Sequence, residues 1–272
     1  MEKTKVLYVT QEMKPYLELT DIAEKARELP QFAQDAGMEI RVLMPRFGII
    51  NERRHRLHEV VRLSGINIII DDDDYPLIIK VASLPGARIQ VYFLDNEDFF
   101  KRKSVFGDKK EDFYDDNAER MIFFCKGVLE TVKKFGWSPD IVHCHGWFTS
   151  LVPLYLKTAY KNEPVFSESK VVYSVYDQHE DFKLAENFVT KATQINKNIE
   201  NKAMGLYDEG TFAGLEKGAM ANSDAVILGN DNLNGEVRQF VEAIKKPVLK
   251  LENSENYWET YKEFYLSLLE EK

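Results

Sequence analysis

Two histidines that lie two residues apart are the first feature of the sequence that could do chemistry. His143 and His145 flank Cys144 at the end of the apolar run from Asp140 to Cys144, which is typical of a buried strand. Residues two apart on a strand point to the same face, so the two imidazoles could bind a metal ion together. Because the sequence offers no convincing third ligand, we favour histidines that are hydrogen-bonded at the end of a strand, and we predict no metal site.

Two other groups of residues could suggest chemistry. Asp71 to Asp74 are four consecutive aspartates, but calcium loops separate their carboxylates with glycine and other spaced ligands, so a solvated turn is the better interpretation. Cys125 lies on an apolar helix face and Cys144 lies within a strand, so we expect both thiols to be buried. The sequence contains none of the motifs of dinucleotide-binding, Walker, serine-hydrolase or zinc-protease sites.

The elements that position these residues follow from the spacing of apolar side chains. Lys5 to Thr10 predicts a buried strand, residues 19–32 have a helical period, and residues 39–45 predict a second strand. Thr20 or Asp21 is a plausible cap for this helix. Strand, helix and strand in this order form a βαβ unit, which implies a parallel sheet with a right-handed crossover.

The rest of the chain predicts further strands and helices. We expect strands over residues 60–70, 77–83 and 89–94, the first two forming a hairpin closed around residues 71–76. Beyond them we expect helices over 112–135, 147–160, 211–220, 232–243 and 255–269, and strands over 140–144, 170–176, 225–228 and 247–251. Residues 178–209 are polar and weakly periodic, so we expect an insertion with short helices that is the most mobile part of the chain.

These elements predict an α/β fold in one domain spanning residues 1–272. It would be a single Rossmann-like, doubly wound parallel sheet with helices on both faces and an added β-hairpin. With 45 acidic against 36 basic residues, the chain carries a formal net charge of −9. That charge argues against partners such as nucleic acid or an anionic membrane, because phosphate surfaces demand clustered cations. Two cysteines build no disulfide framework, and no long apolar run is present, so we expect a cytoplasmic protein.

Several blocks of the sequence follow one another in a familiar order. They are KVLYVTQEMKPY (5–16), LMPRFG (43–48), VYFLDNEDFFKRKSVFG (91–107), DDNAERMIFFCKGVLE (115–130), PDIVHCHGWFTSLVPLYLK (139–157) and, more weakly, GLEKGAMANSDAVILGNDNLNGEV (214–237). Together they resemble the glycogen and starch synthases, glycosyltransferases of the GT-B fold. The resemblance covers most of this chain but only the N-terminal half of a complete synthase. It therefore implies one half of a GT-B fold.

The first loop departs from the family pattern. The family carries Lys-Thr-Gly-Gly-Leu there, whereas an ungapped comparison places Glu18, Leu19, Thr20 and Asp21 at its first four positions. Glycines would let backbone N–H groups approach a diphosphate, and the lysine would neutralise it. A glutamate repels a nucleotide diphosphate, so we expect this loop to have lost donor binding and to be a solvated, well-capped helix start.

The strand ends depart from the family as well. Where the family reads His-x-His-Asp-Trp-His, this chain keeps His145 and Trp147 but has Gly146 and Phe148 in place of the aspartate and the last histidine. A pocket could therefore persist even though much of the set of polar side chains that lines it in the family is missing here.

After the strand over 171–175 the family presents a His-Asn pair near the substrate. This chain has Tyr176 and Asp177 there, with His179 close behind. Asp177 could accept hydrogen bonds from sugar hydroxyls or could simply be solvated. The aromatic rings of Tyr16, Trp147 and Phe148 could stack on pyranose faces, or they could pack at the edge of the core.

The resemblance suggests candidate substrate-binding residues, which are Tyr16, Asp116, Asn117, His145, Trp147 and Asp177. It supports no catalytic residue, metal or cofactor. Two hypotheses follow, and both expect little or no transfer by the isolated chain. One is a non-catalytic binding or regulatory module whose partner is an α-glucan or a protein of glycogen metabolism. The other is a glucosyltransferase, from ADP-glucose to α-1,4-glucan, whose cleft is completed by a separate C-terminal-domain chain or by a second copy in a homo-oligomer.

Overall fold

Parallel strands make up most of one mixed sheet in the computed structural model, which describes residues 3–108, 113–176, 181–194, 199–230, 233, 235–250 and 257–270. The sheet is 10-stranded, and its order is β10-β9-β8-β7-β1-β2-β6-β5-β3, with β4 paired to β5. Pairing is parallel from β10 to β6 and antiparallel among β6, β5, β3 and β4. The strands are β1 (Lys5–Thr10), β2 (Glu39–Pro45), β3 (His58–Glu59), β4 (Ile66–Ile70), β5 (Asp73–Ser83), β6 (Gln90–Asp95), β7 (Ile141–His145), β8 (Lys170–Val175), β9 (Ala225–Leu228) and β10 (Val248–Lys250).

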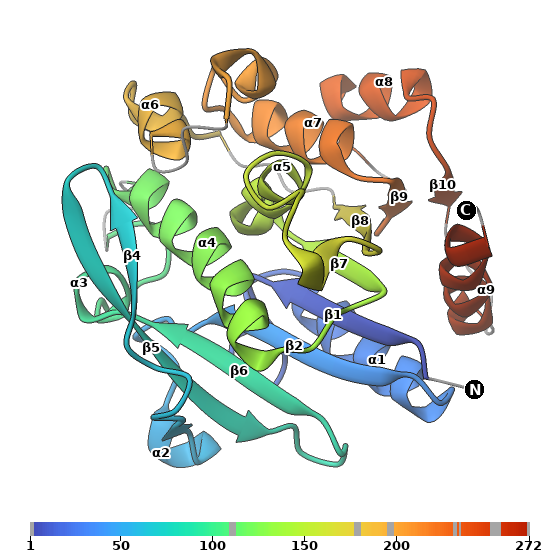
Figure 1. The fold of residues 1–272 in the computed structure, drawn as a ribbon, viewed down its shortest axis with the longest axis horizontal. Coiled ribbons are helices and arrows are strands. Elements are labelled where there is room, and N and C mark those ends of the chain that lie inside the picture. Colours follow the sequence, from blue (N-terminus) through green and yellow to red (C-terminus); the bar gives the residue numbers. More distant parts are fainter. Residues whose placement is uncertain are drawn as a thin grey trace.

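Helices cover both faces of this sheet. Figure 1 shows α4, α5 and α7 on one face, and α1 on the other, where α9 packs beside it through the stacked rings of Phe32 and Trp258. The central strands are buried on both faces, which is why they read as continuous apolar runs in the sequence. The helices are α1 (Ile22–Asp35), α2 (Glu52–His55), α3 (Glu97–Phe100), α4 (Asn117–Phe135), α5 (Leu151–Lys157), α6 (Phe188–Thr193), α7 (Phe212–Asn222), α8 (Gly235–Ala243) and α9 (Tyr257–Glu270), with 3₁₀ turns η1 (Trp147–Thr149), η2 (Pro164–Phe166) and η3 (Asn201–Met204).

The predicted doubly wound sheet with an added hairpin is confirmed, but one strand prediction within it is wrong. Residues 60–70 do not form one strand, because the backbone turns between β3 and β4. The N–H groups of Leu63 and Ser64 donate back to the carbonyl of Val60, and Gly65 has a φ of +82°. The hairpin is formed by β4 and β5, and its turn at residues 71–72 is tighter than the predicted closure around residues 71–76.

The segment predicted to be a polar insertion contributes to the core. Its described parts contain α6 and η3, the short helices that the sequence predicts. They also bury apolar side chains at irregular spacing, namely Phe182, Leu184, Phe188, Ala192, Ile199, Met204 and Tyr207. The sequence shows no apolar face here because these residues follow no single period. None of the helices in the described ranges is long and apolar enough to cross a membrane.

A buried carboxyl group lies between α7 and the sheet. Glu216 is only 2% exposed, and the Tyr173 hydroxyl of β8 donates to its Oε1 atom at 2.7 Å. Burial raises the pKa of Glu216 to about 8, since the charged form is costly in an apolar environment. At neutral pH this side chain is therefore mostly protonated in the folded protein.

Replacing Glu216 with Gln should change how stability depends on pH. The folded pKa of about 8 lies above the ordinary glutamate value of 4.5, so between these two values the unfolded chain loses its proton first. The wild-type free energy of unfolding should therefore fall as pH rises from 5 to 8, by up to about 1 kcal/mol per pH unit from this group. Urea unfolding across this range should show a flatter profile for Glu216→Gln, while the exposed control Glu209→Gln keeps the wild-type slope. Equal slopes in all three proteins would contradict this account.

Candidate functional site

The carboxyl ends of β1, β7 and β8 meet at one edge of the sheet. Thr10 of β1 pairs with His145 of β7, and His145 pairs in turn with Ser174 of β8. In open α/β sheets, ligands bind just outside such carboxyl ends. The residues at and beyond these strand ends therefore form the candidate site.

The two histidines of β7 share one face, as their spacing predicts. Their ring centroids are 4.0 Å apart, and both side chains are fully buried. His143 Nδ1 is 2.5 Å from the Tyr265 hydroxyl of α9, and its Nε2 is 2.7 Å from Ser174 Oγ. Burial lowers the pKa of His143, and it lowers that of His145 to about 3, so both rings stay neutral near pH 7. The described residues contain no group of three or more side chains that could hold a metal ion.

Tyr176 fills the space beside His145. Its hydroxyl lies 2.7 Å from His145 Nδ1. Its ring lies so close to Gly229 that a Cβ atom there would come within 2.3 Å of it. The other ring nitrogen of His145, Nε2, is buried without a hydrogen-bond partner in the described part of the chain. Tyr176 stands where the family pattern has a histidine. The space beside His145 is therefore filled by a side chain of the protein itself.

Gly146, which stands where the family pattern has an aspartate, leaves no room for a side chain. Its φ is +86°, a conformation that L-residues rarely adopt. A Cβ atom at this position would lie 2.4 Å from Oε1 of Gln11. That same oxygen accepts a hydrogen bond from the Phe148 N–H at 3.3 Å. The Gln11 side chain therefore occupies the space that the side chain of an aspartate at position 146 would need.

The aromatic residues that follow Gly146 pack against other rings. Trp147 is 1% exposed and Phe148 is fully buried. The Trp147 ring centroid lies 4.7 Å from that of Phe106 and 4.6 Å from that of Phe182. Phe148 packs against Phe47 in the same cluster. These contacts agree with the alternative that these aromatic residues pack at the edge of the core.

The loop after β1 is held by a buried carboxylate. The N–H groups of Leu19 and Thr20 donate to Glu12 Oε2 at 2.6 and 2.8 Å, and the Thr20 hydroxyl donates to Glu12 Oε1 at 2.7 Å. Burial raises the pKa of Glu12, while these hydrogen bonds act in the opposite direction. The amides of Leu19 and Thr20, which stand where the family pattern has a threonine and a glycine, are thus already bonded to a carboxyl group of the chain itself.

The same loop is acidic on its outer side. Lys14 Nζ forms ion pairs with Glu18 at 2.9 Å and with Glu24 at 3.5 Å. The first helical N–H, that of Ile22, donates to Thr20 Oγ1 at 3.2 Å, and Asp21 makes no side-chain cap. Of the two plausible caps, the structure therefore uses Thr20. Carboxylates outnumber cations along residues 11–24, and the lysine there is already paired.

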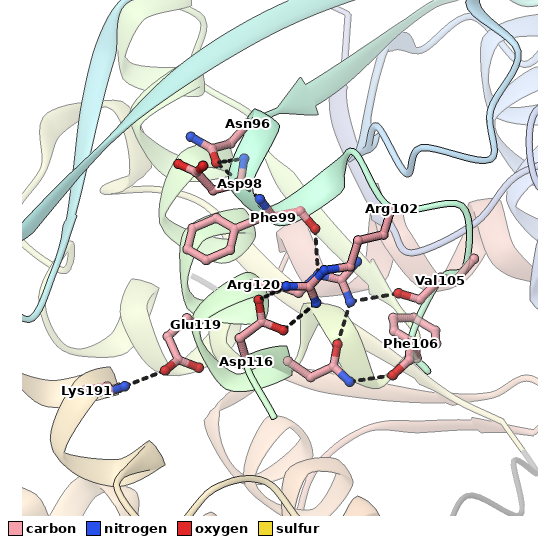
Figure 2. Close-up of polar contacts among 11 residues, drawn as sticks. Asn96, Asp98, Phe99, Arg102, Val105, Phe106, Asp116, Glu119, Arg120 and Lys191 are labelled. Atoms are coloured by element: carbon pink, nitrogen blue, oxygen red, sulfur yellow. Dashed lines mark hydrogen bonds and ion pairs between the residues drawn. The ribbon is translucent and has the colours of Figure 1, made fainter. Parts of the chain in front are cut away.

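The start of α4 holds the segment between α3 and residue 107. Arg120 is fully buried, and its guanidinium donates to the Phe99 carbonyl at 2.8 Å, to the Val105 carbonyl at 2.7 Å and to Asn117 Oδ1 at 2.5 Å. The Asn117 amide donates to the Phe106 carbonyl at 2.7 Å. Figure 2 shows the carbonyls of Phe99 and Val105 directed at the Arg120 guanidinium. Burial lowers its pKa to about 10, so it remains charged near pH 7.

Asp116 lies at the outer side of this cluster (Figure 2). It binds both terminal nitrogens of Arg102, at 2.6 and 2.5 Å. Nearby, Glu119 of α4 pairs with Lys191 of α6, which also contacts Asp71 in the β4–β5 turn at 3.4 Å. The start of α4 therefore joins three segments that are far apart in the sequence.

The structure brings only some of the candidate residues together. His145 and Trp147 lie at the strand-end edge, and Asn117 joins them through Phe106, whose ring contacts Trp147. Asp116 and Asn117 bind arginines and a backbone carbonyl. Tyr16 lies elsewhere: its hydroxyl donates to the Ser83 carbonyl at 3.1 Å, and its ring packs against His55 and Phe93. Asp177 lies outside the described residues.

Three residues that shape this edge were not predicted from the sequence. They are Glu12, Arg120 and Tyr265, each of which acts through partners distant in the chain. One signal was available, because Arg120 stands within the helical run NAERMIFF, where an unpaired charge could not be buried. Nothing in the sequence indicates which carbonyls it binds.

Comparisons with known proteins agree on one family. The sequence model of the starch synthase catalytic domain matches residues 5–244. A glycogen synthase from Chlorobium luteolum is 35% identical over 240 residues, which cover 86% of this chain and 48% of that protein. A glycogen synthase from Chlorobaculum tepidum is 38% identical over 229 residues, covering 84% of this chain and 46% of that protein. The chain thus spans about half the length of these curated relatives.

A solved structure supports the fold. The catalytic domain of starch synthase IV from Arabidopsis thaliana, bound to ADP and acarbose, superposes with a TM-score of 0.69. The match covers 83% of this chain and 45% of that chain, at 17% sequence identity. At this identity the likeness concerns the fold alone, including the central sheet with its flanking helices.

Removing the Arg120 guanidinium should destabilise the protein strongly. In Arg120→Ala, two carbonyls and the Asn117 side chain lose their donor inside the core, so we expect a loss of about 3 kcal/mol or more in the free energy of unfolding. Arg102→Ala is the control, because its partly exposed pair with Asp116 should contribute at most about 1 kcal/mol. Urea unfolding at pH 7 measures both. Similar losses in the two variants would contradict the role assigned to Arg120.

Proposed function

We propose that this chain, which belongs to the family of starch synthase catalytic domains, transfers no glucose by itself and acts as a binding or regulatory module of glycogen metabolism in the cytoplasm. The observation on which this proposal mainly rests is the charge of the loop after β1. Residues 11–24 contain the carboxyl groups of Glu12, Glu18, Asp21 and Glu24 but a single lysine, Lys14, which is already in ion pairs with Glu18 and Glu24. A nucleotide diphosphate brought to this loop would meet repulsion, and within residues 11–24 its negative charge would find no cation that is not already paired.

The strand-end residues support the same conclusion. Acid–base or electrostatic catalysis needs polar groups that point at the reacting atoms. At the two positions where the family pattern supplies a histidine and an aspartate, this chain has Tyr176 and Gly146. Tyr176 is engaged with His145, and the Gln11 side chain lies where a side chain at Gly146 would go. His145 itself is buried and neutral near pH 7.

Of the two partners considered, a protein of glycogen metabolism is favoured over an α-glucan. Sugar recognition through stacking needs an aromatic face that the ligand can reach. Tyr16 is 6% exposed, Trp147 1% and Tyr176 4%, so the rings of these three residues are covered. Glucan binding through these residues would require them to move.

Two assays run side by side test this proposal. Transfer of labelled glucose from ADP-glucose to glycogen should stay at the background level. Electrophoresis through a gel that contains glycogen should show no retardation if the partner is a protein, and retardation would identify the α-glucan as the ligand instead. Transfer above background by the purified chain would contradict the proposal. Transfer that appears only after a second chain is added would establish the alternative of an enzyme completed by a partner.

Restoring the charge of the loop should restore some affinity for nucleotide. In Glu18→Lys combined with Asp21→Gly, the loop exchanges a carboxylate for a cation and regains a flexible residue, so we expect ADP to bind at least ~10-fold more tightly than in the wild type. Equilibrium dialysis with labelled ADP measures the change. The control is Glu209→Lys combined with Asp208→Gly, which changes the charge equally at another exposed site. Equal affinity in the loop variant and its control would show that loop charge does not exclude the donor.

A further inference from the structure

A group of arginines without ion-pair partners stands out on this acidic protein. Arg53 and Arg54 lie on α2, and Arg56 directly follows that helix; all three side chains are exposed. None of them forms an ion pair within the described ranges, although the whole chain carries a net charge of −9. We call these three arginines the basic end.

A matching group of aspartates lies at the β4–β5 hairpin. Asp72, Asp73 and Asp74 are exposed and, within the part of the chain that the structure describes, form no ion pair. Asp71 differs, because it contacts Lys191 of α6 at 3.4 Å. We call Asp72, Asp73 and Asp74 the acidic end.

The two ends cannot meet within one molecule. Asp73 is the first residue of β5, whereas β3, which follows α2 in the chain, pairs with β5 at Lys80 and Val81. Seven residues of extended strand correspond to roughly 23 Å, far beyond the reach of an ion pair. Figure 1 shows the hairpin turn and α2 toward opposite ends of β5.

Both ends are presented on a fixed backbone. Asn51 caps α2 by accepting a hydrogen bond from the Arg54 N–H at 3.0 Å, and Glu52 pairs with Lys80 of β5 at 2.7 Å. At the other end, the contact between Asp71 and Lys191 ties the hairpin turn to α6. Surfaces that are ordered before binding lose less conformational entropy when they associate.

We propose that copies of this chain associate head to tail, with the basic end of one copy on the acidic end of the next. A second copy fits because it supplies a set of three carboxylates for the three arginines. The contact joins two different surfaces, so it generates chains or rings that can exceed a dimer. Exposed ion pairs are individually weak and are screened by salt, so the association is weak and salt-dependent. This proposal does not depend on the absence of glucosyl transfer.

Sedimentation velocity tests the proposal on the full chain. At about 50 mM NaCl the weight-average sedimentation coefficient should rise with protein concentration and pass the value of a dimer, and at about 500 mM NaCl the rise should disappear. Absence of any rise at low salt up to about 1 mM protein would overturn the proposal. A rise that high salt leaves unchanged would overturn it as well.

Charge-reversal variants identify the surfaces involved. Arg53→Glu with Arg54→Glu should remove the association, and so should Asp72→Arg with Asp74→Arg, because each variant then carries two ends of like charge. An equimolar mixture of the two variants should restore it, since their ends are complementary again. The control Asp208→Arg with Glu209→Arg changes the net charge as much as the aspartate variant and should associate at least as well as the wild type. Association in either reversal variant alone, or a mixture that stays monomeric, would refute the proposal.

Discussion

Polar groups that are buried must find hydrogen-bond partners, and this requirement determines the carboxyl edge of the sheet. In this protein the partners come from the chain itself. The Glu12 carboxylate binds the amides of Leu19 and Thr20, and the Tyr176 hydroxyl binds His145. At an edge where other α/β proteins bind ligands, these side chains are thereby bonded to other groups of the same chain. His145 Nε2 is an exception among the described atoms, because it is buried without a partner.

The same requirement explains why membership of the family is compatible with the proposed loss of glucosyl transfer. The fold depends on apolar strands that are covered on both faces, and these are kept. Arg120 satisfies the carbonyls of Phe99 and Val105, so the segment before α4 keeps its path without any ligand. Binding and catalysis depend instead on a few side chains at strand ends. Replacing those side chains changes the chemistry and leaves the sheet intact.

Much of the fold could be predicted from the sequence, because apolar periodicity depends on neighbouring residues. The parallel strands, the long helix α4 and the shared face of His143 and His145 all follow from local spacing. The turn between β3 and β4 could not be predicted, since residues 60–70 look like one continuous strand. Hydrogen-bond partners that are distant in the sequence could not be predicted either, since Tyr265 lies 122 residues from His143 along the chain. Asp116 and Asn117 are polar residues at a helix start, and spacing alone does not show that they bind arginines instead of a substrate.

This chain keeps the fold of a starch synthase catalytic domain, and we propose that its loop after β1 no longer holds a nucleotide sugar. Isothermal titration calorimetry of the wild-type chain with ADP-glucose measures that binding. We expect a dissociation constant no tighter than ~1 mM, which corresponds to about −4 kcal/mol of binding free energy. A dissociation constant in the micromolar range would contradict it, because such affinity requires a loop that attracts the diphosphate.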